Sequence, residues 1–404
     1  MSSTPQIKSV QGGVTASKGF TANGLYAGIK QSGDCDAAFI GSEVPCTAAG
    51  AFTQNNIRAS CVNWCEKILP SNDITAIFCN SGNANACTGV QGEKDTKALA
   101  QAVARCLKTK MKSVLVASTG VIGNSLPMES ILHSIPGLVQ GASTGNGRLF
   151  SQAIMTTDTR FKEYAVRVVT SQGTFHIGGS AKGSGMIHPN MATMLSFITT
   201  DSALGTRELN GVMKRVVDWT FNNLTVDGDC STNDMALILA NGTSGVKISS
   251  KSDLKLFERA LFQVCNNLCA KIAEDGEGAT KRIEVNVVGG KTYKDSKLAA
   301  KAVANSNLVK TAIFGNDPNW GRILCAIGYS GARFSKEKLR VCLGKMPVCK
   351  GTSPVSFPEK KMRAALNKKV VTIDIDLGQG NTCAVAHTCD LTYDYIKINA
   401  EYHT

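Results

Sequence analysis

The segment from residue 182 to residue 195 carries the strongest chemical signal in the chain, because a glycine-containing stretch leads into an Ala192-Thr193 bond and a strand-like apolar run. A threonine hydroxyl is a weak nucleophile unless a base lies beside it, and a threonine at a chain N-terminus can use its own amine as that base. Because Thr193 lies inside the chain, this chemistry requires a cut between Ala192 and Thr193. From the local pattern alone the simpler reading is a threonine that opens a β-strand, where its branched Cβ fits the pleat.

Other positions have the residue types that acyl transfer needs. Thr119-Gly120 follows an apolar run, and a glycine lets backbone N–H groups approach a carbonyl oxygen that becomes negatively charged. Lys182 is flanked by small residues and can bind a carboxylate as a point charge. Glu277 lies between two glycines and can bind an ammonium group. Taken alone, an ordinary turn explains Thr119-Gly120, and a surface position explains each charged residue.

Short motifs of small and polar residues recur from one end of the chain to the other. Besides residues 186–195, they occupy residues 13–20, 80–89, 118–123, 156–159, 226–229, 231–234, 276–281, 315–322 and 398–404. This ordered set resembles the ornithine acetyltransferase family, also called bifunctional glutamate N-acetyltransferase. The resemblance extends over nearly the whole chain, so it is far more specific than any single motif.

The resemblance implies a self-cleaving acetyltransferase of arginine biosynthesis. The Thr193 hydroxyl would attack the carbonyl of Ala192, and hydrolysis of the resulting ester would leave an α chain of residues 1–192 and a β chain of residues 193–404. The new α-amine, with a reference pKa of about 7.7 to 8.0, could then accept the hydroxyl proton near neutral pH. The same hydroxyl would take acetyl from N2-acetyl-L-ornithine and deliver it to L-glutamate, with ping-pong kinetics.

The resemblance also assigns roles to individual residues. It gives Thr119 and Gly120 an oxyanion role, and it implies substrate contacts by Thr156, Lys182, Thr193, Glu277, Asn399 and Thr404. It implies no cofactor. Acetyl-CoA is a second donor in some members of the family, which then acetylate glutamate directly, and no feature of this sequence decides that point.

Some other polar residues are expected to stay outside the chemistry. His188 lies five residues before Thr193, but the implied mechanism does not use a histidine there. Asp227, Asp229 and Asp234 do not match the spacing of an EF-hand loop and are interpreted as structural. The fifteen cysteines include neither a CxxC pair nor a zinc-like spacing, so we expect buried thiols and no metal site.

Composition favours an ordinary globular protein. Hydrophobic residues make up 43% of the 404 residues, and no uninterrupted apolar run reaches the roughly 18 residues of a membrane span. The N-terminus has neither an apolar signal core nor an Arg-rich presequence, so a cytoplasmic protein without a membrane partner is expected. The two fragments must associate because both contribute to one pocket, and the resemblance implies a heterotetramer of two α and two β chains.

The apolar pattern predicts an α/β fold with a mixed sheet in layers, which the resemblance extends to the self-processing, N-terminal-nucleophile-like fold of the family. Residues 164–169 and 174–177 predict a hairpin. The helices are expected at residues 93–107, 209–219 and 257–272. The other strands are expected at residues 37–41, 75–78, 113–117, 194–199, 283–288, 310–314 and 370–375.

Two alternative functions stay open. An N-terminal-nucleophile amidohydrolase or aminopeptidase would share the self-cleavage and use water in place of glutamate. A basic nucleic-acid-binding protein without a catalytic site would explain the net charge of +13. Lysine and arginine are spread along the chain with few aromatic residues among them, so a field that attracts anionic substrates is the better interpretation, and no nucleic-acid partner is expected.

Overall fold

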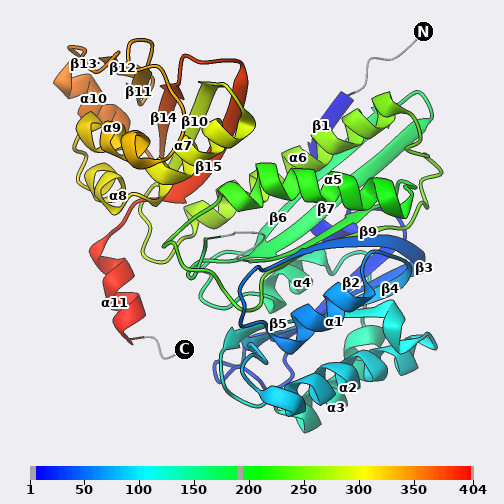
Figure 1. Cartoon of the computed structure of the whole chain (residues 1–404). Coiled ribbons are helices and arrows are strands. Elements are labelled where there is room, and N and C mark those ends of the chain that lie inside the picture. Colours follow the sequence, from blue (N-terminus) through cyan, green and yellow to red (C-terminus); the bar gives the residue numbers. More distant parts are fainter. Residues whose placement is uncertain (1–5, 189–193, 402–404) are drawn as a thin grey trace.

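A computed structural model describes residues 6–188 and 194–401 of the chain, which form two mixed sheets with helices packed on them (Figure 1). The nine strands of the larger sheet are β1 (Gln6–Val10), β2 (Phe20–Leu25), β3 (Ala37–Phe52), β4 (Ser71–Asn83), β5 (Val114–Val121), β6 (Lys162–Thr170), β7 (Gly173–Lys182), β8 (Leu195–Thr200) and β9 (Met235–Ala240). Their order is β1-β6-β7-β8-β9-β3-β4-β5, and β2 pairs with β3. The predicted mixed α/β class is confirmed.

The smaller sheet belongs to the C-terminal part of the chain. Its six strands are β10 (Arg282–Gly290), β11 (Arg340–Leu343), β12 (Met346–Lys350), β13 (Ser353–Pro354), β14 (Val370–Asp376) and β15 (Thr382–Cys389), in the order β13-β12-β11-β14-β10-β15. The helices that share an apolar core with this sheet are α7 (Tyr293–Asn305), α8 (Asn307–Phe314), α9 (Trp320–Tyr329) and α10 (Glu359–Leu366). They enclose an apolar core that is separate from those of the larger sheet.

The larger sheet is covered by helices on both faces. On one face lie α1 (Ser60–Ile68), α2 (Gly89–Leu107), α3 (Met128–Gln140) and α4 (Gly147–Ala153), and on the other lie α5 (Thr206–Trp219) and α6 (Lys251–Glu274). Phe197 and Ile198, neighbours in β8, are both buried but belong to different cores. Successive side chains of a strand point to opposite faces, so β8 is buried on both faces, and its polar residues Ser196, Thr199 and Thr200 are buried together with its apolar ones.

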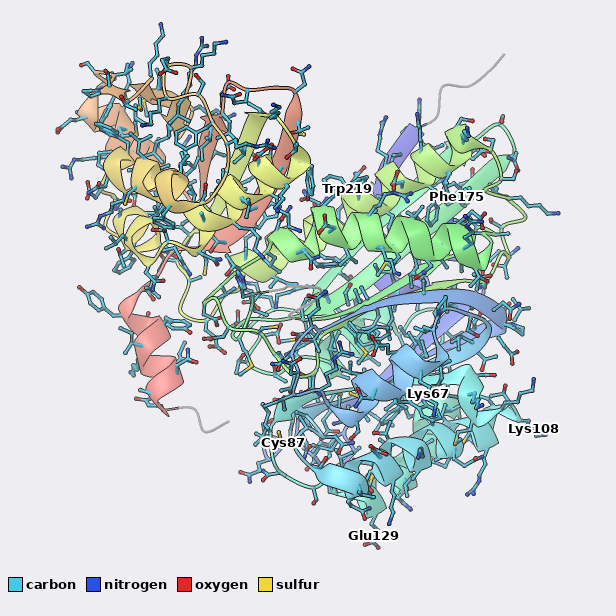
Figure 2. The ribbon with its side chains drawn as sticks, in the orientation of Figure 1. Lys67, Cys87, Lys108, Glu129, Phe175 and Trp219 are labelled. Atoms are coloured by element: carbon cyan, nitrogen blue, oxygen red, sulfur yellow. The ribbon has the colours of Figure 1, made fainter. Side chains whose placement is uncertain are left out.

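The apolar core between the larger sheet and the helices α5 and α6 shows how these helices pack on the sheet. Phe175 of β7 packs against Phe257 of α6, with ring centroids 6.1 Å apart. Figure 2 shows Phe175 in this interior, whereas Lys108 and Glu129 lie at the outer edge of the α2 and α3 layer. None of the helices in the described part of the chain is long and apolar enough to cross a membrane.

The predicted elements are largely confirmed, with longer bounds. The expected hairpin is β6 and β7, which pair antiparallel, and the three expected helices lie within α2, α5 and α6. The strand predicted at 310–314 is wrong, because these residues belong to the helix α8 (Asn307–Phe314). The Ser306 side chain accepts a hydrogen bond from the Val309 N–H at its start, and the Lys281 ammonium donates to the Ile313 carbonyl at its end. These caps satisfy backbone groups that a helix terminus leaves open.

The cysteines also depart in part from the expectation. All fifteen are free thiols, and Cys265 and Cys269 lie buried on one side of α6 as predicted. Cys87, Cys106 and Cys325 are exposed, together with Cys383. Only some of the fifteen cysteines are therefore buried, whereas the sequence predicted burial for all of them.

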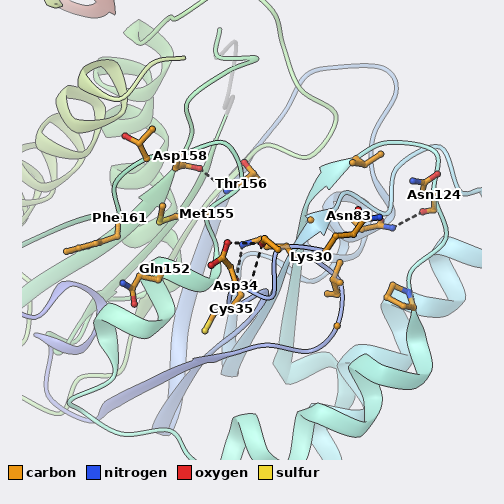
Figure 3. A pocket seen from close by; sticks show the side chains of 18 of the residues that line it. Lys30, Asp34, Cys35, Asn83, Asn124, Gln152, Met155, Thr156, Asp158 and Phe161 are labelled. Carbon is orange, nitrogen blue, oxygen red and sulfur yellow. Dashed lines mark hydrogen bonds between the residues drawn. The ribbon is translucent and has the colours of Figure 1, made fainter. Parts of the chain in front are cut away.

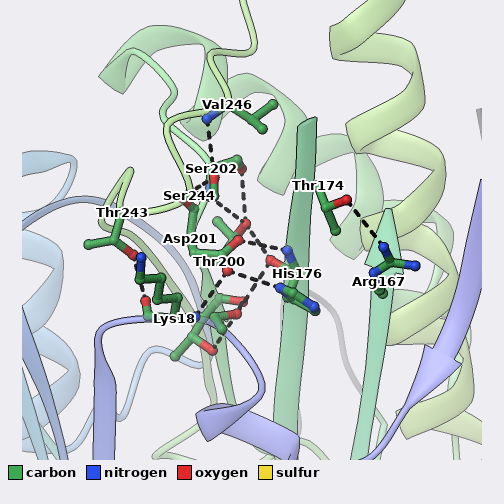
Figure 4. A network of polar contacts seen from close by, with 12 residues as sticks. Lys18, Arg167, Thr174, His176, Thr200, Asp201, Ser202, Thr243, Ser244 and Val246 are labelled. Carbon is green, nitrogen blue, oxygen red and sulfur yellow. Dashed lines mark hydrogen bonds and ion pairs between the residues drawn. The ribbon is translucent and has the colours of Figure 1, made fainter. Parts of the chain in front are cut away.

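The motif at residues 13–20 has a structural role. The Asp201 carboxylate, just beyond the end of β8, accepts hydrogen bonds from the backbone N–H groups of Lys18 and His176 at 3.0 and 2.6 Å (Figure 4). The Thr199 hydroxyl donates to the Val14 carbonyl at 2.7 Å. The motif is thus attached to the end of β8 that lies away from Thr193.

Candidate active site

The predicted site residues that the structure describes line a single pocket of about 110 Å³. The pocket includes Thr119, Gly120, Thr156, Lys182, Glu277 and Asn399. Ala192, Thr193 and Thr404, which the sequence also predicts for the site, lie outside the described residues. Met194, the residue that follows Thr193, is 3% exposed and lines the pocket.

Thr119 and Gly120 lie at the end of β5, which pairs in parallel with β4. Gly120 has a φ of +133°, a conformation that residues with a side chain rarely adopt. A Cβ at this position would lie 2.2 Å from the carbonyl carbon of Gly82, so only glycine fits against β4. The close approach leaves the backbone of Gly120 at the pocket wall, as an oxyanion site requires.

Asn233, which also lines the pocket, holds the ends of β4 and β5 together. Its side-chain amide donates to the carbonyl of Ser118 at 2.8 Å and to the carbonyl of Ala84 at 2.6 Å. All three residues are buried, so no bulk water can replace these bonds. Asn233 therefore fixes the backbone directly before Thr119, a role that the sequence did not predict.

Lys182 ends β7 and directs its ammonium group at the oxyanion region. Its Nζ donates to the Thr119 hydroxyl oxygen at 3.1 Å. The Thr119 oxygen is the acceptor of this bond, and the Thr119 hydroxyl proton can therefore be donated to another group. Burial lowers the pKa of Lys182, and the negative charge of Asp158 opposes the shift. A cation at this place favours negative charge in the pocket.

Glu277 supplies a second charged group to the pocket, a carboxylate. It follows α6 and is 9% exposed, and its backbone N–H donates to the Ser184 carbonyl at 3.1 Å. Its Oε2 accepts a hydrogen bond of 2.9 Å from Asn399 in the C-terminal helix α11 (Tyr393–Glu401). A Cβ on Gly185 would lie 2.2 Å from this carboxylate, so the glycine permits the close approach.

A buried ion cluster of Asp158, Lys162 and Asp275 supports the pocket from behind. The Lys162 ammonium lies 2.5 Å from an Asp158 oxygen and 2.6 Å from an Asp275 oxygen, and each of these side chains is at most 5% exposed. The Asp158 carboxylate also accepts from the N–H groups of Gly183 and Thr156, at 2.7 and 3.0 Å. The cluster therefore fixes both the Thr156 loop and the chain that follows Lys182.

The charges of the cluster determine how Asp158 ionises. Burial alone would raise the pKa of Asp158, but the positive charges of Lys162 and Lys182 outweigh it and bring the pKa to about 2. The carboxylate is therefore charged at any pH at which the protein would work, which is typical of a fully hydrogen-bonded structural ion.

Asp234 was expected to have only a structural role, but it is buried in the lining of the pocket. The sequence suggested a structural carboxylate, yet Asp234 lines the pocket, is 3% exposed, and has an Oδ2 without a hydrogen-bond partner in the described part of the chain. Burial raises its pKa well above the ordinary value, and the Ser231 hydrogen bonds and the Lys182 charge oppose the shift. One signal was available, since Asp234 directly precedes the fully apolar run of β9.

Asp227 contacts the loop before the predicted cut, and His188 lies outside the pocket lining. The Asp227 carboxylate accepts from the N–H groups of Met186 and Ile187 at 2.6 and 2.8 Å, so it shapes the loop before the predicted cut. A His188 ring nitrogen lies 3.2 Å from the Thr225 hydroxyl, and His188 is not among the residues that line the pocket. Burial and the charge of Lys301 lower the pKa of His188 to about 4.

A larger cleft of about 1420 Å³ adjoins the pocket and shares Thr156 with it. Figure 3 shows Lys30, Asp34 and Cys35 on one side of the cleft, with Asp158 and Phe161 across from them. The lining thus carries charges of both signs. Within residues 6–188 and 194–401, no group of three or more histidine, cysteine or acidic side chains is arranged to hold a metal ion.

The layered mixed α/β fold gathers a hydroxyl, an ammonium and a carboxylate in one pocket, where β8 begins. The chain belongs to the ArgJ family, whose model matches residues 21–404. The family predicted from the motifs is confirmed.

The chain is similar to named relatives over nearly its whole length. It is 46% identical over 397 residues to the arginine biosynthesis bifunctional protein ArgJ of Symbiobacterium thermophilum, covering 97% of this chain and 99% of that protein. A crystal structure of the protein of the same name from Bacillus halodurans is 44% identical with a TM-score of 0.50, and it covers 52% of this chain and 100% of that one. An ornithine acetyltransferase from Mycobacterium tuberculosis, solved with ornithine, is 40% identical with a TM-score of 0.43 and covers 46% of this chain and 100% of that one.

Proposed function

We propose that the chain is a self-cleaving acetyltransferase of arginine biosynthesis, which moves acetyl from N2-acetyl-L-ornithine to L-glutamate through an ester on Thr193. The observation that carries the proposal is the convergence of Thr119, Lys182 and Glu277 on the pocket where Met194 and β8 begin. The names of the relatives support the pathway and the acetyl chemistry.

The pocket residues suit the two half-reactions. In the first, the Thr193 oxygen attacks the acetyl carbonyl of acetylornithine, its proton passes through the Thr193 α-amine to the departing nitrogen, and the C–N bond breaks. In the second, the amine of glutamate attacks the ester, and the proton returns to the Thr193 oxygen. Thr119 and Gly120 stabilise the oxyanion in both steps. Thr156, Asn399 and the predicted Thr404 complete the contacts with the amino acid, with Lys182 near its carboxylate and Glu277 near its ammonium group.

Both fragments are needed for this pocket. Thr119, Thr156 and Lys182 belong to residues 1–192, whereas Glu277 and Asn399 belong to residues 193–404. Two ladders of backbone hydrogen bonds, β7 with β8 and β3 with β9, cross from one fragment to the other and would hold them together. The Bacillus halodurans structure also supports the division, since its complete chain corresponds to about the length of residues 193–404.

The donor and the assembly are finer parts of the proposal. The adjoining cleft leaves room for a larger donor, so we include acetyl-CoA as a second acetyl source and no bound cofactor. Initial rates with each donor, at saturating glutamate, measure this directly. A cytoplasmic heterotetramer of two α and two β chains remains a prediction. Size-exclusion chromatography with light scattering would measure the mass of the assembly.

The proposal is tested by the Thr193→Ala variant. Denaturing electrophoresis of the wild type should show two fragments of similar size, and the variant should show one band of 42.7 kDa without transfer activity. Thr352→Ala, in an exposed turn of the smaller sheet, is the matched control and should behave as the wild type. An uncut and active wild type would exclude the proposal, and acetate release that does not depend on glutamate would favour the amidohydrolase alternative.

A further inference from the structure

Thr193 cannot supply the base that removes its own hydroxyl proton during the proposed self-cleavage. Until the chain is cut, the nitrogen of Thr193 is part of the peptide bond to Ala192, and an amide nitrogen does not accept a proton at neutral pH. The α-amine that serves the acetyl transfer is therefore a product of the cut. Another group must take the hydroxyl proton during the cut itself.

The pocket offers few groups for this task. The Lys182 Nζ already donates to the Thr119 hydroxyl oxygen, so it is directed at the predicted oxyanion region. Glu277 has one oxygen bonded to Asn399, and its carboxylate lies against Gly185. Asp234 is the remaining carboxyl group among the pocket residues that the structure describes, and its Oδ2 has no partner there.

The strand pairing places Asp234 near the attachment point of Thr193. Met235, the next residue, donates its N–H to the Met194 carbonyl at 3.0 Å. Leu195 then pairs with Met235 on one side and with Lys182 on the other. The hydrogen bond between Met235 and Met194 therefore joins the residue after Asp234 to the residue after Thr193.

The surroundings of Asp234 suit a proton acceptor. Burial raises the pKa of the Asp234 carboxyl well above its ordinary value, which makes its carboxylate a stronger base. The charge of Lys182 and the hydrogen bonds of Ser231 favour the ionised form and oppose this rise in pKa. By contrast, the fully bonded Asp158 has a pKa of about 2 and is a poor base.

We propose that Asp234 is the proton acceptor of the self-cleavage, an inference that rests on the proposed function. The Asp234 carboxylate takes the proton of the Thr193 hydroxyl as its oxygen bonds to the carbonyl carbon of Ala192. The resulting tetrahedral centre collapses as Asp234 returns the proton to the Thr193 nitrogen, and the C–N bond breaks. Water then hydrolyses the ester between Ala192 and Thr193, which yields the carboxylate of Ala192, the free hydroxyl and the α-amine.

The experiment measures how fast the newly made full-length chain is converted into fragments during cell-free synthesis. A short pulse of labelled methionine is followed by a chase and by denaturing electrophoresis. Asp234→Asn keeps the shape of the side chain and removes the base, so conversion of the 42.7 kDa chain should slow by about 100-fold or more. Asp229→Asn is the matched control, because this nearby carboxylate is exposed and does not line the pocket, and it should be cut at the wild-type rate.

Hydroxylamine separates the attack from the later hydrolysis, because it cleaves esters and leaves peptide bonds intact. The Asp234→Asn chain should release no fragments with hydroxylamine, since the ester has not formed. Fragments released only with hydroxylamine would mean that the attack proceeds without Asp234, and the inference would be wrong. Cleavage of Asp234→Asn at the wild-type rate would overturn it as well.

A second variant covers the case in which Asp234→Asn does not fold. Asp234→Ala leaves space for a small carboxylate, so added formate should speed its cleavage at least 10-fold over chloride at equal ionic strength. A purely structural role of Asp234 predicts no response to formate, and that result would contradict the inference. If the wild type is itself never cut, the proposed function fails; if the wild type and Asp234→Asn are both cut normally, only the role of Asp234 fails.

Discussion

Asp158 and Asp234 are both buried acidic residues at the pocket, but their surroundings differ in nearly every other respect. Asp158 accepts hydrogen bonds from Lys162, Gly183 and Thr156, so both of its oxygens are used. Asp234 has an Oδ2 without a described partner. Their pKa values are displaced in opposite directions, Asp158 to about 2 and Asp234 well above its ordinary value.

The contrast shows that burial by itself does not decide what a carboxyl group does. A buried carboxylate whose lone pairs are all bonded stabilises the elements that bond to it, and removal of a partner is costly. A buried carboxyl with an unused oxygen costs stability in the folded state, and such groups persist where they have a chemical task. We therefore assign Asp158 to the structure of the pocket and Asp234 to its chemistry.

The largest effect on stability is expected from Lys162→Met. The variant leaves Asp158 and Asp275 as two buried carboxylates without their shared cation, which should lower the free energy of unfolding by about 3–5 kcal/mol. Urea denaturation followed by fluorescence measures the change. Lys110→Met is the control, because its ion pair with Asp73 is exposed and should cost at most about 1 kcal/mol. Equal losses in both variants would remove the distinction between the cluster and a surface pair.

The comparison itself is tested by the same substitution at both sites. Asp158→Asn removes the charge that binds Lys162 and should cost about 2–3 kcal/mol of stability, the range of hydrogen bonds to charged groups. Asp234→Asn replaces a buried carboxyl group that has an unsatisfied oxygen and should change stability by less than about 1 kcal/mol, while it slows the cut. A greater loss of stability in Asp234→Asn than in Asp158→Asn would show that we have interchanged their roles.

Asn233→Ala should reduce turnover more than it affects binding. Without the amide, the carbonyls of Ser118 and Ala84 lose their donor, and the Thr119-Gly120 backbone can shift. Small displacements of a catalytic group reduce rates by about 10- to 100-fold, so kcat should fall in that range with KM little changed. Asn241→Ala, which loses a similar bond to the Lys18 carbonyl far from the pocket, should retain its kcat.

The smallest effect is expected from Glu277→Gln, which keeps the bond to Asn399 and removes the negative charge. The KM of the amino-acid substrates should rise about tenfold, equivalent to about 1.4 kcal/mol, because their ammonium groups lose an ionic partner. Cleavage of the chain should proceed at the wild-type rate, because Asp234 is intact. Slow cleavage in Glu277→Gln would point to Glu277 as the proton acceptor instead.

The sequence predicted the fold class and most elements because their patterns are local. The apolar positions of α6 recur on one helical face, and Tyr164 to Ile177 contains a hairpin with a glycine turn. The strand predicted at 310–314 was wrong because Lys281, a distant residue, caps the helix that forms there. An apolar run of that length fits a strand or a helix, and tertiary contacts decide between them.

The candidate site was predictable to the extent that its residues lie in motifs. Thr119, Lys182 and Glu277 were predicted because they lie in motifs that resemble those of the family, and the structure brings them into one pocket. The sequence did not predict the roles that we propose for Asp234 and Asn233, because the contacts that suggest these roles involve residues far along the chain. Burial of a carboxyl oxygen without a donor is a property of the packed molecule, and no spacing in the sequence records it.

The most direct test is a mass spectrum of the purified wild type after incubation with N2-acetyl-L-ornithine in the absence of glutamate. The account predicts two polypeptides, of which the one that begins at Thr193 gains a single acetyl group on that residue and loses it when glutamate is added. One intact polypeptide, or an acetyl group that never reaches Thr193, would contradict it.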